Sequence, residues 1–194
     1  IPNFIDLHRF QKRPHDHFKK TLCPNGEKLL MHTSNFRKVK RIQDIVKVFA
    51  LVRKKIPAKL VLIGDGPERS GIEVLCRELE VQNDVRFLGK MDGIEEALSL
   101  ADLFLLTSEK ESFGLAALEA MACEVPVISS NAGGIPEVNI HGVTGFVSEI
   151  GDVNDMAANA IKMLSDPILH EKMKANALKR AHAHALAHLP SFFR

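Results

Sequence analysis

The sequence lacks the features that mark secreted and membrane-spanning proteins. Its cysteines number only three, Cys23, Cys76 and Cys123, and they form no C-x-x-C pair, so a reducing cytoplasmic setting is a simpler interpretation than a disulfide framework. The longest apolar runs are much shorter than the roughly 20 residues that a membrane-spanning helix needs. The first residues also lack the basic and apolar regions of a signal peptide. We therefore expect a cytoplasmic protein without a membrane span.

An excess of charge of either sign is absent too. The chain has 26 lysines and arginines against 24 aspartates and glutamates, a net charge of +2, which gives no general electrostatic case for nucleic acid or a membrane surface as a partner. Its 194 residues, 45% of them hydrophobic, are enough for one well-packed core. The composition predicts one domain and leaves open whether copies of the chain form a homo-oligomer.

Motifs of metal and nucleophilic catalysis are missing as well. The sequence has no D-x-D pair, no H-E-x-x-H and no cysteine-histidine cluster with ligand spacing, so we expect neither a metal nor a cofactor. It has no G-x-S-x-G elbow. Gly64-Asp65-Gly66-Pro67 begins like a dinucleotide-binding loop, but Arg69 stands where the third glycine is required. This loop predicts instead a tight turn that lets a ligand or a facing lobe come close.

What the sequence does have is a regular alternation of short apolar runs and helical patterns. The expected strands are residues 28–33, 60–64, 85–89, 103–107, 125–129 and 145–148. Helical spacing of apolar residues occurs at 42–52, 72–79, 94–101, 115–122 and 156–164. This alternation predicts a parallel sheet covered on both faces, a Rossmann-like doubly wound α/β fold.

The two ends of the chain do not follow that alternation. Residues 1–27 carry three prolines and no sustained period, which predicts an entry segment before a Rossmann-like domain at 28–169. Residues 170–194 form a predicted C-terminal tail, helical up to about residue 187. Its alanine- and histidine-biased repeat has little amphipathic pattern, and nothing in it indicates a function.

The most informative stretch is ESFGLAALE, from Glu111 to Glu119. It follows a predicted strand and opens a predicted helix, and Gly114 lets backbone come close to a ligand. A helix N-terminus in that position is a common anion site, so phosphate is the obvious ligand. Glu111 and Glu119 would repel phosphate and are better suited to accept hydrogen bonds from hydroxyls that the phosphate carries. The pattern favours a sugar or ribose phosphate. The plain alternative is that Glu111 is a surface acid and Glu119 a helix acid.

A basic loop follows the first predicted strand. SNFRKVKR, residues 34–41, places Arg37, Lys38, Lys40 and Arg41 within five positions, and such residues can neutralise a diphosphate without metal. A solvated basic helix cap explains the same local pattern. The position after a strand favours the diphosphate clamp, because open parallel sheets bind ligands beyond the carboxyl ends of their strands.

A second glycine-containing loop joins the fifth predicted strand to a short helix. In NAGGIPE, residues 131–137, Pro136 suits the first helical turn. Gly133 and Gly134 are free to adopt positive φ. This loop is either simple turn chemistry or a source of backbone amides for the anion pocket.

On these residues the sequence resembles the retaining glycosyltransferases of family 4, which have the two-lobed GT-B fold. ESFGLAALEAMACEVPVISSNAGGIPEV is similar to the family's E-x7-E region. IGDGPERSGIEVL, VRFLGKMDGIEEALSLADLFLLTSEKE and HGVTGFVSEIGDVNDMA are similar to its flanking motifs, in the same order. The resemblance covers residues 3–164 and implies the C-terminal, donor-binding lobe; it does not extend to the acceptor-binding N-terminal lobe.

The resemblance also implies roles for particular residues. Glu119 would accept hydrogen bonds from ribose hydroxyls, and Glu111 would hold hydroxyls of the donor sugar. The amides that open the helix would meet sugar and phosphate, and the backbone of residues 86–88 would read the base. The implied donor-binding residues are Asn35, Arg86, Leu88, Ser112, Phe113, Gly114, Leu115 and Glu119.

The basic residues depart from the family's Gly-Arg-(four residues)-Lys-Gly pattern. Lys40 matches the lysine, but Asn35 takes the position of the arginine and Arg41 that of the last glycine. We expect Arg37 to compensate for the missing arginine. The implied catalytic residues are therefore Glu111, Lys40 and Arg37.

The substrates are implied only by resemblance. SNFRKVKR together with ESFGLAALEAMACEVPV is most similar to the family members of bacillithiol biosynthesis, which implies a UDP-sugar, UDP-N-acetylglucosamine, as donor and L-malate as acceptor. Composition and spacing do not indicate the acceptor. The alternatives are a family 4 transferase with other substrates, a nucleotide-sugar-binding module inactive by itself, and a UDP-N-acetylglucosamine 2-epimerase on the same scaffold.

Overall fold

The protein is built on one parallel sheet of six strands in the order β3-β2-β1-β4-β5-β6. The computed structural model describes residues 5–13 and 16–187, so residues 1–4, 14–15 and 188–194 of the predicted entry segment and tail lie outside the described residues. The strands are β1 (Lys28–Thr33), β2 (Ala58–Ile63), β3 (Val85–Gly89), β4 (Leu103–Leu106), β5 (Val127–Ser130) and β6 (Gly145–Ser148). The predicted Rossmann-like α/β fold is confirmed.

The sheet is apolar on both faces, as a central parallel sheet requires. In β4, Leu103 and Leu105 belong to the core on one face, while Phe104 and Leu106 belong to the core on the other. Successive side chains of a strand point to opposite faces. A continuous apolar run therefore fills both cores at once, and helices must cover both.

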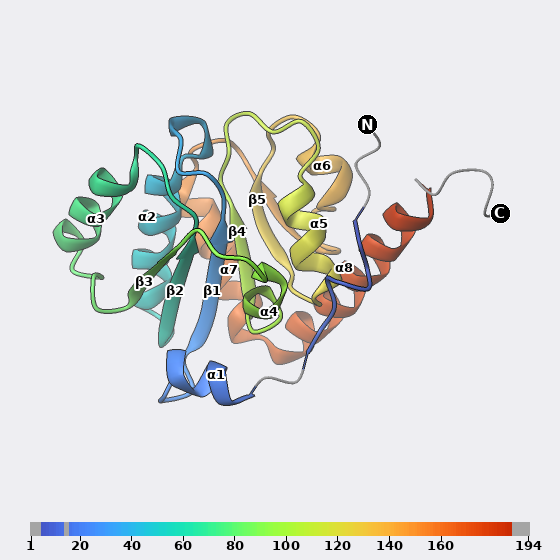
Figure 1. The fold of residues 1–194 in the computed structure, drawn as a ribbon, viewed down its shortest axis with the longest axis horizontal. Coiled ribbons are helices and arrows are strands. Elements are labelled where there is room, and N and C mark those ends of the chain that lie inside the picture. Colours follow the sequence, from blue (N-terminus) through green and yellow to red (C-terminus); the bar gives the residue numbers. More distant parts are fainter. Residues whose placement is uncertain (1–4, 14–15, 188–194) are drawn as a thin grey trace.

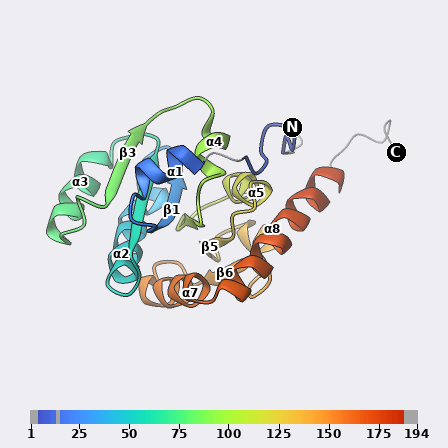
Figure 2. The same ribbon diagram turned by 90° about the horizontal axis from the view of Figure 1, so that it is seen from below.

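Helices cover both faces of the sheet (Figures 1 and 2). One core contains side chains of α2, α3 and α7, and the other contains those of α4, α5 and α6. The helix α8 contributes to both, with Met173 in the first core and Ala177 and Ala181 in the second. The larger helices are α2 (Ile42–Arg53), α3 (Arg69–Glu78), α5 (Leu115–Ala122), α7 (Val153–Ser165) and α8 (Pro167–Ala187). The shorter ones are α1 (Asp16–Leu22), the 3-10 helix η1 (Lys38–Lys40), α4 (Ile94–Leu98) and α6 (Ile135–Val138).

The predicted strands at 28–33, 85–89 and 145–148 and the predicted helix at 115–122 have the bounds that the structure shows. The fifth strand begins at Val127, two residues later than predicted. The reason is that the Val125 amide turns back to the Ala120 carbonyl, 3.0 Å away, and closes the end of α5. Pro126 has no amide proton to add to the sheet. The helix predicted at 94–101 ends at Leu98 and continues as turns.

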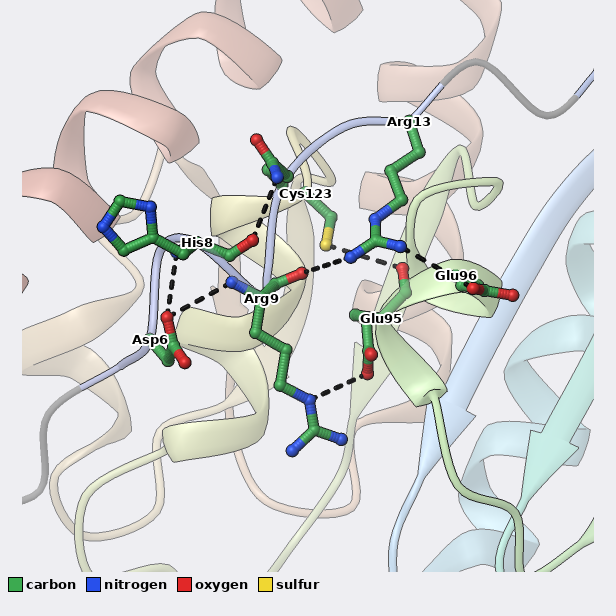
Figure 3. Close-up of polar contacts among 8 residues, drawn as sticks. Asp6, His8, Arg9, Arg13, Glu95, Glu96 and Cys123 are labelled. Atoms are coloured by element: carbon green, nitrogen blue, oxygen red, sulfur yellow. Dashed lines mark hydrogen bonds and ion pairs between the residues drawn. The ribbon is translucent and has the colours of Figure 1, made fainter.

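The N-terminal part of the chain holds a helix that the sequence did not predict. α1 lies within the predicted entry segment. The residues before it, from Asp6 to Arg13, lie beside α4 (Figure 3). Asp6 accepts a hydrogen bond from the backbone N–H of Arg9 at 3.2 Å, and Arg9 Nε donates to Glu95 Oε2 at 3.0 Å. Arg13 lies 3.6 Å from Glu96. These contacts fix residues 6–13 beside α4 and bring the Arg9 charge near α5.

The C-terminal helix starts three residues before the predicted tail and packs against α5. The division into an entry segment, a domain and a tail stays a prediction. Within residues 5–13 and 16–187, the structure contains no helix that is both long and apolar enough to cross a membrane.

Candidate functional site

Two loops meet where the strand order reverses, between β1 and β4. The chain leaves β1 toward α2 on one face and leaves β4 toward α5 on the other, which opens a crevice at the carboxyl ends of the strands. A cavity of about 340 Å³ lies there. It is lined by Thr33, Ser34, Asn35, Lys40, Leu106, Glu111, Leu115, Ala116 and Glu119. The topology therefore places the cavity where the sequence analysis expected the ligand.

A second cavity of about 240 Å³ adjoins the first. The two share Thr33, Ser34 and Asn35. The remaining lining residues of the second cavity are Ile63, Gly64, Asp65, Lys90, Met91 and Ile94. An elongated ligand can therefore run along the sheet edge from the β2–β3 side to the N-terminus of α5.

An ion pair stands in the lining of the first cavity. Lys40 Nζ lies 2.7 Å from Glu111 Oε2, and the two side chains are only 22% and 19% exposed. Lys40 comes from η1 after β1, whereas Glu111 comes from the loop after β4. A positive and a negative group thus stand side by side in one partly enclosed space, suited to a ligand that carries both phosphate and hydroxyls.

The loops that carry this pair are joined by further hydrogen bonds. Thr107 Oγ1 donates to the carbonyls of Lys40 and Arg41, at 3.1 and 3.0 Å. The Glu109 amide donates to the Val39 carbonyl at 2.9 Å. Because Thr107 is fully buried, these bonds are shielded from water. These hydrogen bonds therefore hold the loop of Lys40 against the loop of Glu111.

Glycines support both loops from behind. A Cβ on Gly64 would lie 1.8 Å from the Ser34 carbonyl oxygen, and one on Gly133 would lie 1.8 Å from the Glu111 carbonyl oxygen. Gly134 likewise packs against Ser112. The close approach expected at Gly64 is thus an approach to the Ser34 loop of the same sheet edge. Both glycine-containing loops act as supports for the residues that line the site.

The N-terminus of α5 forms one wall of the first cavity. Gly114 is its N-cap, with φ of 83°, a left-handed conformation that glycine adopts without strain. No side chain caps this end, as far as the described residues go. The first amides of a helix have no partner within the helix, and the helix dipole adds partial positive charge there. Leu115 and Ala116, at this end, line the cavity beside Lys40.

Glu119 lies one turn further along α5 and faces the same cavity. Burial raises the pKa of Glu119 to about 7; the Arg9 guanidinium opposes this rise and Glu95 adds to it. The carboxyl group is thus poised between its neutral and charged forms near neutral pH. A ligand hydroxyl that donates to it would favour the charged form.

The structure brings together five of the residues singled out from the sequence. Asn35, Lys40, Glu111, Leu115 and Glu119 line the first cavity. It does not bring all of them there. Arg37, Arg86, Leu88 and Ser112 are exposed and lie outside the lining of both cavities. The roles given to these residues stay predictions.

Phe113, another of those residues, contacts the C-terminal helix. Its ring lies edge-on to His184 of α8, with centroids 5.8 Å apart. Gly114, which completes the set, is the buried N-cap of α5. The predicted tail therefore touches the site loop from outside.

Sequence reasoning did not predict Thr33, Lys90 and Met91 as lining residues, and it placed Ser34 in the basic loop without giving it a role. The signal was present for each, because Thr33 ends β1, Ser34 follows it, and Lys90 and Met91 follow β3. Residues at these ends are the ones that meet a ligand in an open parallel sheet. The hydroxyl groups of Thr33 and Ser34 carry no charge, so the charge pattern of the sequence did not indicate them.

With this geometry in place, comparison with known proteins decides the family. The model described as "Glycosyl transferases group 1" matches residues 15–180, most of the chain. The chain belongs to the group 1 glycosyltransferases. This confirms the resemblance given by the ordered motifs.

Curated relatives agree with that membership. The chain is 50% identical over 178 residues to the N-acetyl-alpha-D-glucosaminyl L-malate synthase of Bacillus anthracis, covering 91% of this chain and 47% of that protein. It is 32% identical over 136 residues to the 2-deoxystreptamine N-acetyl-D-glucosaminyltransferase of Niallia circulans, covering 66% of this chain and 35% of that protein. This glycosyltransferase chain spans about half the length of the first of these relatives and less of the second.

Solved structures share the fold. Anabaena HepE in complex with UDP and glucose superposes with a TM-score of 0.85 at 25% identity, covering 93% of this chain and 51% of HepE. The C-terminal domain of the group 1 protein LpcC from Francisella tularensis has a TM-score of 0.82 at 24% identity, covering 92% of this chain and 97% of that domain. The chain therefore has the fold of one lobe of a GT-B glycosyltransferase.

Proposed function

We propose that the chain is the donor-binding lobe of a glycosyltransferase that moves N-acetylglucosamine from UDP-N-acetylglucosamine to L-malate, with retention of configuration and without a metal. The observation that carries the donor half of this proposal is the cavity itself. It combines Lys40, the N-terminus of α5 and two carboxylates in one space. Phosphate needs the first two, and sugar hydroxyls need the carboxylates.

Each group has a task in donor binding. Lys40 and the first amides of α5 neutralise the diphosphate, and both stabilise the negative charge that grows on it as the sugar–phosphate bond breaks. Glu111 accepts hydrogen bonds from the donor sugar, and Glu119 accepts them from the ribose. Positive groups at the diphosphate can thus supply the stabilisation that a divalent cation supplies elsewhere.

The choice of substrates is supported by the relative from Bacillus anthracis, whose name specifies N-acetylglucosaminyl transfer to L-malate. UDP as the nucleotide is supported by HepE, which was solved with UDP. The acceptor would bind between this lobe and another, because the chain spans about half the length of that relative. In this proposal, residues outside the 194 supply the acceptor side.

A cytoplasmic location is part of the same proposal. Cys23, Cys76 and Cys123 are buried free thiols. Free thiols are the usual state of cysteine in a reducing compartment. The proposed donor, a UDP-sugar, is soluble and would be used in that compartment.

The deciding experiment is a product assay of the full-length parent enzyme with UDP-N-acetylglucosamine and a panel of hydroxy acids and sugars. A glycoside formed with L-malate, with retained configuration and undiminished by a metal chelator, is the expected product. A glycoside with another acceptor would overturn the malate assignment. Free epimerised sugar would indicate a 2-epimerase instead.

A second candidate is a nucleotide-sugar-binding module without turnover of its own, and the partial length of the chain favours it. Calorimetry of the 194-residue chain with UDP and UDP-N-acetylglucosamine tests it. Binding without turnover supports the module. Malate-dependent turnover by this chain alone contradicts it.

A further inference from the structure

His32 is a buried histidine that directly precedes the lining residues Thr33 and Ser34. It stands in β1 with no exposed surface, and both ring nitrogens have partners. Nδ1 lies 2.8 Å from the Leu105 carbonyl oxygen, and Nε2 lies 2.7 Å from Ser34 Oγ. The ring also stacks on Phe104, with centroids 6.0 Å apart. These contacts leave the imidazole one orientation.

The partners also decide where the ring proton is. A carbonyl oxygen can only accept a hydrogen bond, so Nδ1 must carry the proton that it donates to Leu105. Burial lowers the pKa of His32 to about 4; the bond to Leu105 opposes this shift and the Lys40 charge adds to it. The ring is therefore neutral at pH 7, and Nε2 is left as an acceptor. Its partner, the Ser34 hydroxyl, must donate.

Ser34 is consequently an acceptor toward the site. Its single hydroxyl proton is directed at His32, so only the oxygen lone pairs are available to a ligand. Ser34 lines both cavities, at the point where they meet. A diphosphate at neutral pH offers acceptors and cannot use such a group, whereas a ribose hydroxyl can donate to it.

We infer that Ser34 accepts a hydrogen bond from a ribose hydroxyl of the nucleotide and that His32 is a positioning residue that holds Ser34 in this acceptor state. The inference rests on the proposed function, because it assigns a nucleotide to the cavity. It assigns different parts of the nucleotide to two residues of the site. Lys40 serves phosphate, and Ser34 serves the sugar of the nucleoside.

The test is calorimetry on the 194-residue chain with UDP, 2′-deoxy-UDP, 3′-deoxy-UDP and pyrophosphate. Ser34→Ala should weaken UDP binding roughly 2- to 13-fold, the value of one neutral hydrogen bond, and leave pyrophosphate binding unchanged. Wild type and Ser34→Ala should bind one of the two deoxy analogues with equal affinity. Ser34→Thr, which keeps the hydroxyl, should recover most of the loss for UDP.

Three results would overturn the inference while the proposed function stands. They are unchanged UDP binding by Ser34→Ala, an equal loss for pyrophosphate, and a loss that persists with both deoxy analogues. Failure of the wild-type chain to bind UDP would defeat the proposed donor as well as this inference.

The positioning role of His32 has its own readouts. Nitrogen NMR of the labelled chain should show His32 protonated at Nδ1 and not at Nε2, without any ligand. The double variant His32→Phe/Ser34→Ala should bind UDP no more weakly than the worse single variant, because both remove one interaction. An Nε2-protonated ring, or additive losses, would contradict the role, and thermal unfolding of His32→Phe checks that the fold is intact.

Discussion

Lys40 Nζ and Glu111 Oε2 lie 2.7 Å apart, although the two residues are separated by 71 positions and stand on loops from different strands. The pair places the main positive charge of the cavity beside one of its two carboxylates. A bound diphosphate would share Lys40 with Glu111. The two residues therefore make opposite contributions to nucleotide binding, and their variants should separate them.

Lys40→Met should weaken UDP binding to the 194-residue chain. A charge-assisted hydrogen bond contributes about 1.5 to 3 kcal/mol, which corresponds to roughly 10- to 150-fold in Kd. Lys38→Met is the matched control, because Lys38 stands in the same 3-10 helix but is exposed and does not line the cavity. Calorimetry should find the control within about twofold of wild type. Equal losses for the two variants would indicate nonspecific attraction by the basic loop.

Removing the Glu111 carboxylate should change the preference between ligands. In Glu111→Gln, Lys40 is released from its partner, so UDP should bind at least as tightly as to wild type. UDP-N-acetylglucosamine should lose its advantage over UDP, because the sugar loses an acceptor. In the full-length parent enzyme, Glu111→Ala should lower kcat/KM by roughly 10- to 150-fold. Activity within twofold of wild type would exclude a role for Glu111 in holding the sugar.

Nucleotide binding should depend on the charge of Glu119. Its pKa is raised to about 7 in the free protein, and ribose hydroxyls bind best to the charged form. Binding must therefore release a proton below about pH 7. UDP affinity should rise with pH up to about pH 7 to 8 and then level off, falling by up to about tenfold for each unit below pH 7.

The control for this pH dependence is Glu119→Gln. This variant keeps the titration of the UDP phosphate, whose pKa is about 6, and loses the titration of the carboxyl group. The difference between the two profiles is the contribution of Glu119. Arg9→Met should move the wild-type midpoint to higher pH, because Arg9 opposes the rise in the pKa of Glu119. Arg13→Met, which removes a contact with Glu96 instead, should not. Superimposable profiles for wild type and Glu119→Gln would exclude this linkage.

The fold could be predicted from the sequence to a large extent, and the reason is visible in particular strands. Apolar runs such as β4 fill both faces of the sheet and mark strands. The strands at 28–33, 85–89 and 145–148 were predicted with their bounds, and β4 was predicted one residue too long. α1 was missed because its seven residues carry few apolar side chains. Tertiary contacts stabilise such a short helix, since its own propensity is too weak.

The site was predicted in part for a related reason. Glu111, Glu119 and Lys40 follow from motif and strand position, but the 2.7 Å contact of Lys40 with Glu111 depends on β1 and β4 being neighbours, which local sequence does not specify. The partners of His32 depend on the same pairing. Gly64 was seen as a site of close approach, whereas the group that approaches it, the Ser34 carbonyl, is known only from the fold.

Gly133→Ala should disturb the site by displacing the loop that carries Glu111. The added Cβ would lie 1.8 Å from the Glu111 carbonyl oxygen, a backbone atom that cannot rotate away. Gly142→Ala is a matched control, because Gly142 also has positive φ, 75° against 52°, but has open space around it. We expect the control to lose about 1 kcal/mol of unfolding free energy and Gly133→Ala to lose a further ~1 to 3 kcal/mol.

Urea unfolding measures the stability of both variants, since a shift in the midpoint at an unchanged m-value reports a change in the free energy of unfolding. Gly133→Ala should also bind UDP-N-acetylglucosamine more weakly, while Gly142→Ala should bind it as wild type does. Equal stability of the two variants would mean that the Glu111 loop can shift at little cost. That result would contradict the rigid support inferred from the glycines.

Arg41 stands where the family pattern has glycine, and its backbone is left-handed, with φ of 50° and ψ of 44°. This conformation costs an L-residue about 1 to 2 kcal/mol. Arg41 offsets the cost through Asp44, whose Oδ2 lies 2.6 Å from its Nε and whose side chain is only 4% exposed. Arg41→Ala keeps the backbone strain and loses the ion pair, whereas Arg41→Gly loses both.

We therefore expect Arg41→Gly to be more stable than Arg41→Ala by about 1 kcal/mol, with both less stable than wild type because Asp44 loses its closest partner. Arg37 provides the control pair, since it is exposed and its φ of −104° is ordinary extended backbone. There the order should reverse, with Arg37→Ala more stable than Arg37→Gly, because glycine loses more conformational freedom on folding. Urea unfolding of the four variants decides the matter. If the alanine and glycine variants had the same order of stability at both positions, the left-handed backbone of Arg41 would not be the strain that the family glycine relieves.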